Sequence, residues 1–317
     1  MLALAAKRIL LMPVLLLVAS FVIFSMMYLA PGSPEAVLLG GKQATPEAYE
    51  RVTEEYHLDD PFFTQYGLWL GRFVTGDFGD SITLTDSVAN VVGPRIMPTM
   101  QLTLMASVLI MLVGVVLGMV SALKAGGALD VGISLFVLVL AAVSPAIMSL
   151  ILISVVAIDL GWLPALGLGD GGFDQIRHLI LPSIALAASV VALVGRTARI
   201  SMIRTLNQEF IETARSRGLS GRSVVVKHAF RHALIPVVTI SGLIVGYLLS
   251  GAVVVEYAFG LNGLGGLLVD SVQSGDFAVV QAIALILVFA FLVINLVVDL
   301  LYALIDPRVR LAAGKAS

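Results

Sequence analysis

Residues 208–236, QEFIETARSRGLSGRSVVVKHAFRHALIP, decide how the rest of the chain is arranged. The stretch lies between two apolar runs and carries five basic residues against two acidic ones, Glu209 and Glu212. A basic segment between membrane spans is typical of a cytoplasmic loop. Gly218 is a candidate helix C-cap, and Ser220 predicts the start of a second helix. We therefore expect a helix–glycine–helix elbow on the inner side of a membrane, with small residues at its bend.

The composition of the chain places it in a lipid bilayer. Its 317 residues are 59% hydrophobic and only 13% charged, with a mean hydropathy of +1.02. Soluble domains carry about 25% charged residues, so this value is roughly half the ordinary one. Cysteine is absent, which excludes disulfides, thiolate metal sites and a cysteine nucleophile. The fold class predicted from these features is an all-α integral membrane protein.

Hydropathy predicts six membrane spans. Residues 9–30 would form a helix of about 33 Å, enough to cross a hydrocarbon core of about 30 Å. A cleaved signal peptide is the alternative, but its apolar core is usually about 7–15 residues. The other predicted spans are residues 99–123, 131–158, 179–194, 234–255 and 278–305. Most lysines and arginines then fall on one side, which predicts that both termini are cytoplasmic.

The predicted spans divide the chain into four parts. These are an N-terminal transmembrane helix at 1–30, an extracytoplasmic loop region at 31–98, a transmembrane core at 99–305 and a cytoplasmic tail at 306–317. The loop region is acidic, and Thr45-Pro46 predicts the start of a short helix. A second helix is expected within residues 61–78. Inside the core, Ser144-Pro145 predicts a break in the third span, and residues 200–233 form the inner loop.

Motifs for catalysis and ligand binding are missing. The chain has no G-x-x-x-x-G-K-[ST], and the glycine cluster Gly260–Gly266 lacks the lysine of a phosphate-binding loop, so we expect a turn there. His228 and His232 are four residues apart, but a zinc site normally needs three or four ligands and basic residues surround this pair. We therefore expect no catalytic, cofactor-binding or metal site in this chain.

Two acidic residues near span ends allow two interpretations. Glu256 is predicted at the outer end of the fifth span, and Asp299 lies about two turns from the inner end of the sixth. A proton or ion relay is one hypothesis, although coupling groups of secondary transporters usually lie near the midplane. The other hypothesis, which we favour, is a structural ion pair of Asp299 with Arg196 or Arg199.

The elbow carries a family resemblance. Glu212-Thr-Ala-Arg-Ser-Arg-Gly218, with His232-Ala-Leu-Ile-Pro236 behind it, resembles the EAA loop of ABC-importer permeases, in the longer-spaced form of peptide and nickel permeases. Thr213 stands where the motif has its first alanine, and Ser33-Pro34 varies the usual Gly-Asp-Pro. Other stretches that resemble the family occur in order along the chain: Ala30–Pro34, Gly76–Ser81, Gly161–Pro164, Val255–Phe259 and Asp306–Arg308. The similarity is to the first of the two permeases in dipeptide and oligopeptide importers.

This resemblance implies the ABC type I importer permease fold with a long helical outer loop, and a subunit without enzymatic activity. It implies a second, homologous permease in a heterodimer, two ATPase subunits that bind ATP and Mg, and an extracytoplasmic substrate-binding protein. In that family the loop forms a coupling helix that docks on the ATPase. The resemblance assigns this coupling to Glu212, Ala214, Arg217 and Gly218. It places the multi-pass chain in a bacterial cytoplasmic membrane, with a peptide substrate and no nucleic-acid partner.

Two alternatives stay open at this point. Nickel or another small solute is the alternative substrate, because peptide and nickel permeases share these motifs. An independent proton-coupled carrier or channel is the alternative of another class, and it would require midplane charges and inverted repeats. Neither feature is evident in the sequence.

Overall fold

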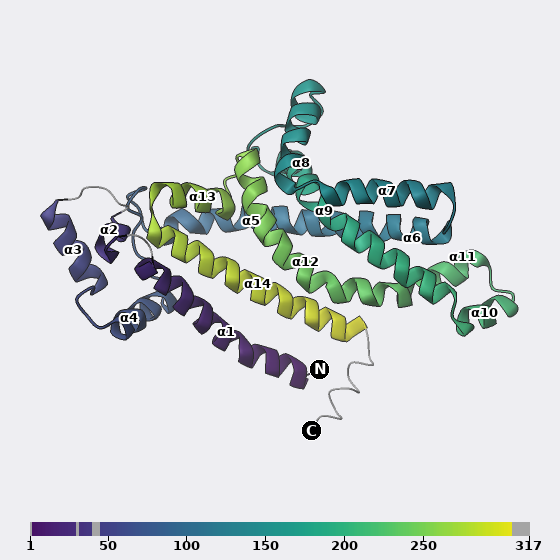
Figure 1. Cartoon of the computed structure of the whole chain (residues 1–317), viewed down its shortest axis with the longest axis horizontal. Coiled ribbons are helices and arrows are strands. Elements are labelled where there is room, and N and C mark those ends of the chain that lie inside the picture. The colour runs from purple at the N-terminus through teal and green to yellow at the C-terminus, as the bar shows by residue number, and fades with distance from the viewer. Residues whose placement is uncertain (1, 30–31, 40–44, 306–317) are drawn as a thin grey trace. The chain divides into compact units, whose positions relative to one another are not determined.

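The structure is a computed structural model that describes residues 2–29, 32–39 and 45–305. These ranges form helices joined by short turns, and no strand occurs within them (Figure 1). The chain separates into two compact units, one formed chiefly by residues 101–260 and the other by residues 6–100 and 261–293. The predicted tail at 306–317 and its Asp306–Arg308 motif lie outside the described residues, as do Ala30 and Pro31.

The helices confirm an all-α membrane protein. Five helices are long and apolar enough to cross a membrane, or up to seven if each of two bent pairs counts as one span. The six predicted spans fall within this range. In unit 1 the segments are α5 (Val88–Leu109, which begins in unit 2), η1 (Ile110–Gly114), α6 (Val115–Leu123), α7 (Ala128–Ala142), α8 (Pro145–Ile151), η2 (Leu152–Asp159), α9 (Gly172–Leu206), α10 (Glu209–Ser216), α11 (Gly221–Ser223), η3 (Val224–Ala229) and α12 (Phe230–Phe259). In unit 2 they are α1 (Leu2–Leu29), α2 (Pro34–Leu38), α3 (Pro46–Tyr56), α4 (Phe62–Val74), α13 (Leu264–Ser274) and α14 (Phe277–Ile305, which ends in unit 1).

The long helix α9 is the centre of unit 1. It packs against α6, α7, α8 and α12, and most of its apolar window is buried. At 35 residues it is much longer than the predicted fourth span, 179–194. The helix continues past the predicted span at both ends, through the charged residues at which that prediction stopped.

Two glycines allow α6 and α9 to approach closely. A methyl group placed on Gly118 would lie 2.7 Å from the Ala198 Cβ and 3.0 Å from the Arg199 amide nitrogen. One placed on Gly114 would lie 2.8 Å from a Val194 methyl carbon. In lipid there is no hydrophobic driving force between helices. Small residues at a crossing promote association because they permit close van der Waals packing.

An ion pair joins α7 to α9. The Arg199 guanidinium donates two hydrogen bonds of 2.7 Å to the Asp130 carboxylate, whose side chain is only 6% exposed. The Ser121 hydroxyl and the Gly126 amide also donate to this carboxylate. Arg199 therefore pairs with Asp130, whereas the favoured hypothesis from the sequence paired Asp299 with Arg196 or Arg199. The side chain of Asp299 lies outside the described residues.

The third predicted span is broken where Ser144-Pro145 indicated. Helices α7 and α8–η2 meet at 103°, and the Ser144 hydroxyl accepts a hydrogen bond from the Ile147 amide as the N-cap of α8. Proline has no backbone N–H, so at the first position of α8 it removes one amide that would otherwise lack a hydrogen-bond acceptor.

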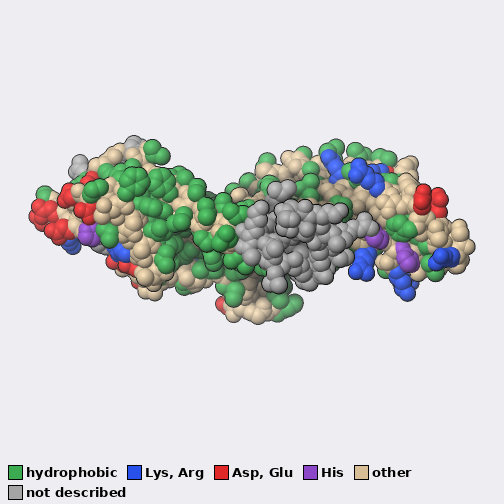
Figure 2. All heavy atoms as spheres, turned by 90° about the horizontal axis from the view of Figure 1, so that it is seen from below, with side chains coloured by type: hydrophobic (Ala, Val, Ile, Leu, Met, Phe, Trp, Pro, Cys, Tyr) green, Lys and Arg blue, Asp and Glu red, His purple; other side chains and the backbone are tan. Residues whose placement is uncertain are grey.

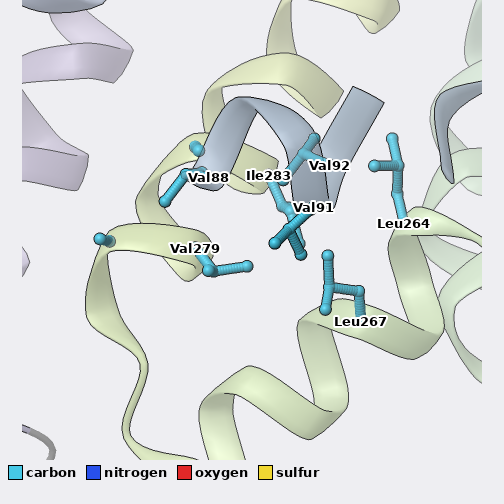
Figure 3. Packing of buried hydrophobic residues seen from close by; sticks show 9 residues of the cluster. Val88, Val91, Val92, Leu264, Leu267, Val279 and Ile283 are labelled. Atoms are coloured by element: carbon cyan, nitrogen blue, oxygen red, sulfur yellow. The ribbon is translucent and has the colours of Figure 1, made fainter. Parts of the chain in front are cut away.

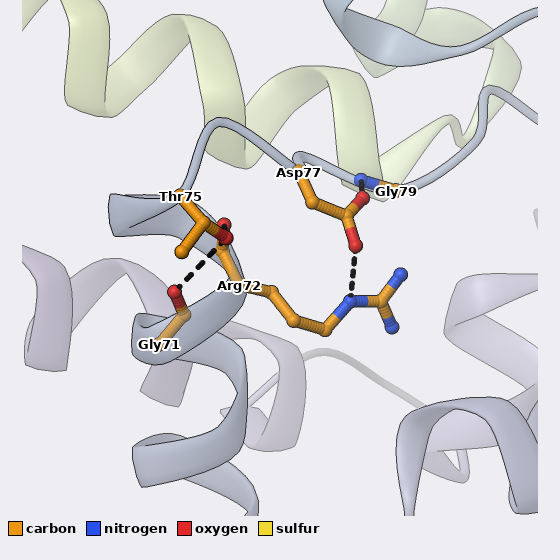
Figure 4. A network of polar contacts seen from close by, with 5 residues as sticks. All are labelled: Gly71, Arg72, Thr75, Asp77 and Gly79. Carbon is orange, nitrogen blue, oxygen red and sulfur yellow. Dashed lines mark hydrogen bonds and ion pairs between the residues drawn. The ribbon is translucent and has the colours of Figure 1, made fainter.

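The predicted outer loop region forms three helices in unit 2. Thr45 and Pro46 open α3 as expected, and α4 lies within the second predicted helix; the short α2, capped by Ser33, was not predicted. Aromatic rings of α1 and α4 pack together, and Phe21 lies edge to face with both Phe62 and Tyr66. In the last turn of α4, Arg72 donates a 2.8 Å hydrogen bond to Asp77, which follows the helix, and Asp77 also accepts from the Gly79 amide (Figure 4).

Helix α13 packs against α5 and α14 through a cluster of buried aliphatic side chains (Figure 3). The predicted turn at Gly260–Gly266 is correct only in its first half. Gly260 ends α12 in the left-handed region (φ +59°), whereas Leu264 already begins α13. The buried Asp276 carboxylate precedes α14 and accepts hydrogen bonds from the hydroxyls of Ser81 (2.5 Å) and Thr83 (2.6 Å).

Candidate functional site

The elbow, defined here as residues Glu209–Ser223, begins with α10 and a tight reversal. The Gly218 amide donates to the Arg215 carbonyl at 2.9 Å, and the Leu219 amide donates to the Ala214 carbonyl at 3.3 Å. These two bonds form a Schellman motif, which places its glycine one residue beyond the C-cap in the left-handed region. Gly218 has φ +79°, so the predicted helix-ending role is correct.

The second arm of the elbow starts at once. The Ser220 hydroxyl accepts from the Ser223 amide at 3.4 Å, as its predicted capping role requires. The chain then continues through α11 and the π-helical segment η3 into α12. Segments of π-helix are rare and often occur at functional sites, and this one lies where the elbow joins a membrane helix.

A small hydrophobic cluster holds the two arms together. It contains the buried side chains Ile211 and Ala214 of α10, Val224 and Ala229 of η3, and Met202 of α9. Only 8% of Ala214 is exposed. The expectation that Ala214 offers a small exposed surface at the bend is therefore wrong: its methyl group faces the chain's own core.

The opposite side of the elbow is exposed and polar. Glu212, Arg217 and Gly218 lie on it, and nothing within 4 Å would obstruct a side chain at Gly218. Leu219, at 41% exposure, adds an apolar side chain that sequence reasoning missed, although a leucine directly after a C-cap glycine is a recognisable signal. Figure 2 shows lysine and arginine side chains over this end of unit 1, with few acidic ones.

The charges of α10 follow the direction of its helix dipole. Glu209 and Glu212 occupy the first turn, and Arg215 the last. Acidic residues are favourable near a helix N-terminus and basic ones near its C-terminus, each by about 0.3–1 kcal/mol. The arrangement therefore stabilises a short exposed helix and leaves its side chains available to a partner.

His228 and His232, which are four residues apart, are not joined by further metal ligands among the described residues. The His232 ring packs against Phe210 of α10, with centroids 5.1 Å apart. Among the residues that the structure describes, no group of three or more His, Cys, Asp or Glu could hold a metal ion. The elbow is a bent, exposed and largely polar surface.

Comparison with known proteins identifies the family. Residues 114–311 match the model of the binding-protein-dependent transport system inner membrane component, and residues 1–96 match that of its N-terminal region. The chain belongs to this family. It is therefore an ABC-importer permease, a non-catalytic, multi-pass subunit of the inner membrane. The family implies ATPase, substrate-binding-protein and permease partners.

Individual relatives align along nearly the whole permease. A glutathione transport system permease protein of Escherichia coli K12 is 39% identical over 305 residues, which is 96% of this chain and 97% of the relative. A second relative, from Brucella abortus strain 2308, is named as a peptide transport system permease protein. It is 38% identical over 301 residues, which is 94% of this chain and 95% of the relative.

Proposed function

We propose that this permease forms half of the pathway by which an importer moves di- and oligopeptides across the bacterial cytoplasmic membrane. The observation that carries the proposal is the full-length similarity to permeases named for glutathione and peptide transport. Glutathione is itself a tripeptide. The second half of the pathway would come from a homologous permease in a heterodimer, and both termini would be cytoplasmic.

The elbow would transmit the action of two ATPase subunits, which would bind ATP and Mg. Its bend is fixed by the Gly218 reversal and by the hydrophobic cluster beneath α10, so a force applied to the exposed face would reach α9 and α12. Glu212, Arg217 and Gly218 would contact the ATPase. Ala214 would act indirectly, by anchoring α10 to the cluster.

The loop region at 31–98 would contact the substrate-binding protein outside the cell. Helix α3 exposes Glu47, Glu50 and Glu54, and Figure 2 shows acidic side chains gathered at this end of unit 2. Such a surface suits a basic rim on the binding protein, because complementary charges steer association.

Binding assays on the cognate substrate-binding protein test the substrate. We expect di- and tripeptides, including glutathione, to bind and Ni²⁺ alone not to bind. Tight Ni²⁺ binding without peptide affinity would overturn the peptide assignment and favour the nickel alternative.

The Gly218→Asp variant tests the coupling role. An aspartate at φ +79° costs roughly 1 kcal/mol in backbone strain and alters the bend. We expect the variant to stay in the membrane but to lose the ATPase subunits during purification. Gly221→Asp is the matched control, because Gly221 is an exposed elbow glycine with ordinary φ and open space around it. Normal co-purification of the ATPases with Gly218→Asp would refute the role.

A further inference from the structure

One face of α12 is exposed along a regular line of residues. Apart from Arg231, which lies about a quarter turn to one side, the exposed positions with described side chains are His232, Pro236, Thr239, Tyr247, Ser250, Val254 and Tyr257. Apart from the interval between Thr239 and Tyr247, which spans two turns, they are spaced three or four residues apart. This spacing places them on one side of a helix. We call this line the α12 stripe.

The chemistry of the stripe differs from that of a lipid-facing helix. Four of its members carry a hydroxyl group: Thr239, Tyr247, Ser250 and Tyr257. On α14 the exposed positions with described side chains within 289–300 are Phe289, Phe291, Val297 and Leu300, all hydrocarbon. Polar groups turned toward acyl chains cost free energy unless they find partners. The Thr239 hydroxyl donates to the Ile235 carbonyl of its own helix at 3.0 Å, so in lipid this cost would fall on the other hydroxyls of the stripe.

The stripe is long enough to cross the membrane. From Thr239 to Tyr257 the helix rises about 27 Å, close to the roughly 30 Å of a hydrocarbon core. The Tyr247 hydroxyl lies 3.1 Å from the Ser189 hydroxyl of α9, which adds a second polar group at this depth.

The elbow end of the stripe opens into a cavity of about 380 Å³. His232 and Pro236 of the stripe line it, together with Ser201, Arg204 and Gln208. The lining combines these polar side chains with the apolar Phe210 and Ile235. The stripe and the cavity meet at His232 and Pro236, within unit 1.

We propose that the α12 stripe, with Ser189 and the cavity at its elbow end, is this subunit's wall of the translocation pathway. The inference rests on the proposed function for its substrate, an amide-rich peptide. Hydroxyl groups both donate and accept hydrogen bonds, so they pair with peptide N–H and C=O groups of any sequence. Between Thr239 and Tyr257, the described side chains of the stripe carry no charge, which suits transient contact during passage.

Cysteine accessibility tests the inference, because the chain contains no cysteine of its own. Thr239→Cys, Ser250→Cys and Tyr257→Cys are made singly in the complete importer, with cysteine-free partner subunits. Leu135→Cys on α7 and Val297→Cys on α14 are matched controls at exposed apolar positions. A small, charged methanethiosulfonate reagent reacts with thiolates, which require water. Labelling is measured in the resting and the nucleotide-trapped state.

We expect each stripe cysteine to react at least about tenfold faster than both controls in at least one of the two states. Equal slow labelling in both states would overturn the proposal, whether lipid or a second subunit covers the stripe. The readout needs no substrate, so it is separable from the peptide assignment. Rapid labelling that peptides do not slow would support the pathway and count against peptide as its cargo.

Discussion

Replacing Gly118 with alanine tests the close approach of α6 and α9. The added methyl group would lie 2.7 Å from the Ala198 Cβ and 3.0 Å from the Arg199 amide nitrogen, and it would also contact the Gly195 carbonyl. Two of these neighbours are backbone atoms, so the helices must separate. Overpacking of this kind typically costs about 1–3 kcal/mol.

Gly132→Ala on α7 is the matched control. Gly132 is also helical, and a methyl group there meets nothing within 4 Å. Alanine is about 1 kcal/mol more favourable than glycine within a helix, so this variant should be as stable as the parent or more stable. Gly118 is helical too and gains the same propensity, so the two variants should differ by the overpacking cost alone, about 1–3 kcal/mol.

The assay is the thermal unfolding midpoint of the purified importer in detergent. A loss of 1 kcal/mol lowers the midpoint by about 2–4 °C in a domain of 150–250 residues. We expect Gly118→Ala to unfold at a clearly lower temperature than Gly132→Ala. Equal midpoints would refute the argument that the glycine is required by the helix crossing.

Three further predictions concern polar contacts. Arg199→Ala should lower the unfolding midpoint, because it leaves the Asp130 carboxylate without its cation, whereas the exposed Arg196→Ala should change the midpoint little. Asp276→Ala should cost about 1–3 kcal/mol through its lost hydroxyl hydrogen bonds, with the exposed Asp270→Ala as control in the same unfolding assay. The hydrogen bond from Arg72 and that from the Gly79 amide lower the pKa of Asp77, so its stabilising effect is present at neutral pH and is lost as the pH falls below about 4. The protection factor of the Gly79 amide, which is its exchange rate relative to the intrinsic rate at the same pH, should fall over that range, and Asp77→Asn should remove this change.

Local signals predicted much of this fold. Proline and its capping serine located the break before α8, Thr45-Pro46 located the start of α3, and Gly218 with Ser220 located the two helix ends of the elbow. Each of these features depends on residues within one turn of each other. Such information is available in the sequence without knowledge of the fold.

Long-range pairing could not be predicted in the same way. Arg199 and Asp130 are 69 residues apart, and the sequence offered several acids near the same predicted depth. The inward position of Ala214 depends on how α10 packs on η3, which spacing alone does not determine. Helix α13 was missed because its glycines favour a turn locally, whereas burial of Leu264 and Leu267 against α14 outweighs that preference.

A photo-crosslinking amino acid at Leu219 tests directly whether an ATPase subunit docks on the exposed face of the elbow. Leu219 is 41% exposed on the elbow, and Leu84, at 46% exposure in the predicted outer loop region, is the control position. In the complete importer we expect an adduct between the permease and an ATPase subunit from position 219 and none from position 84. Absence of the ATPase adduct at 219, or an equal yield from both positions, would contradict it.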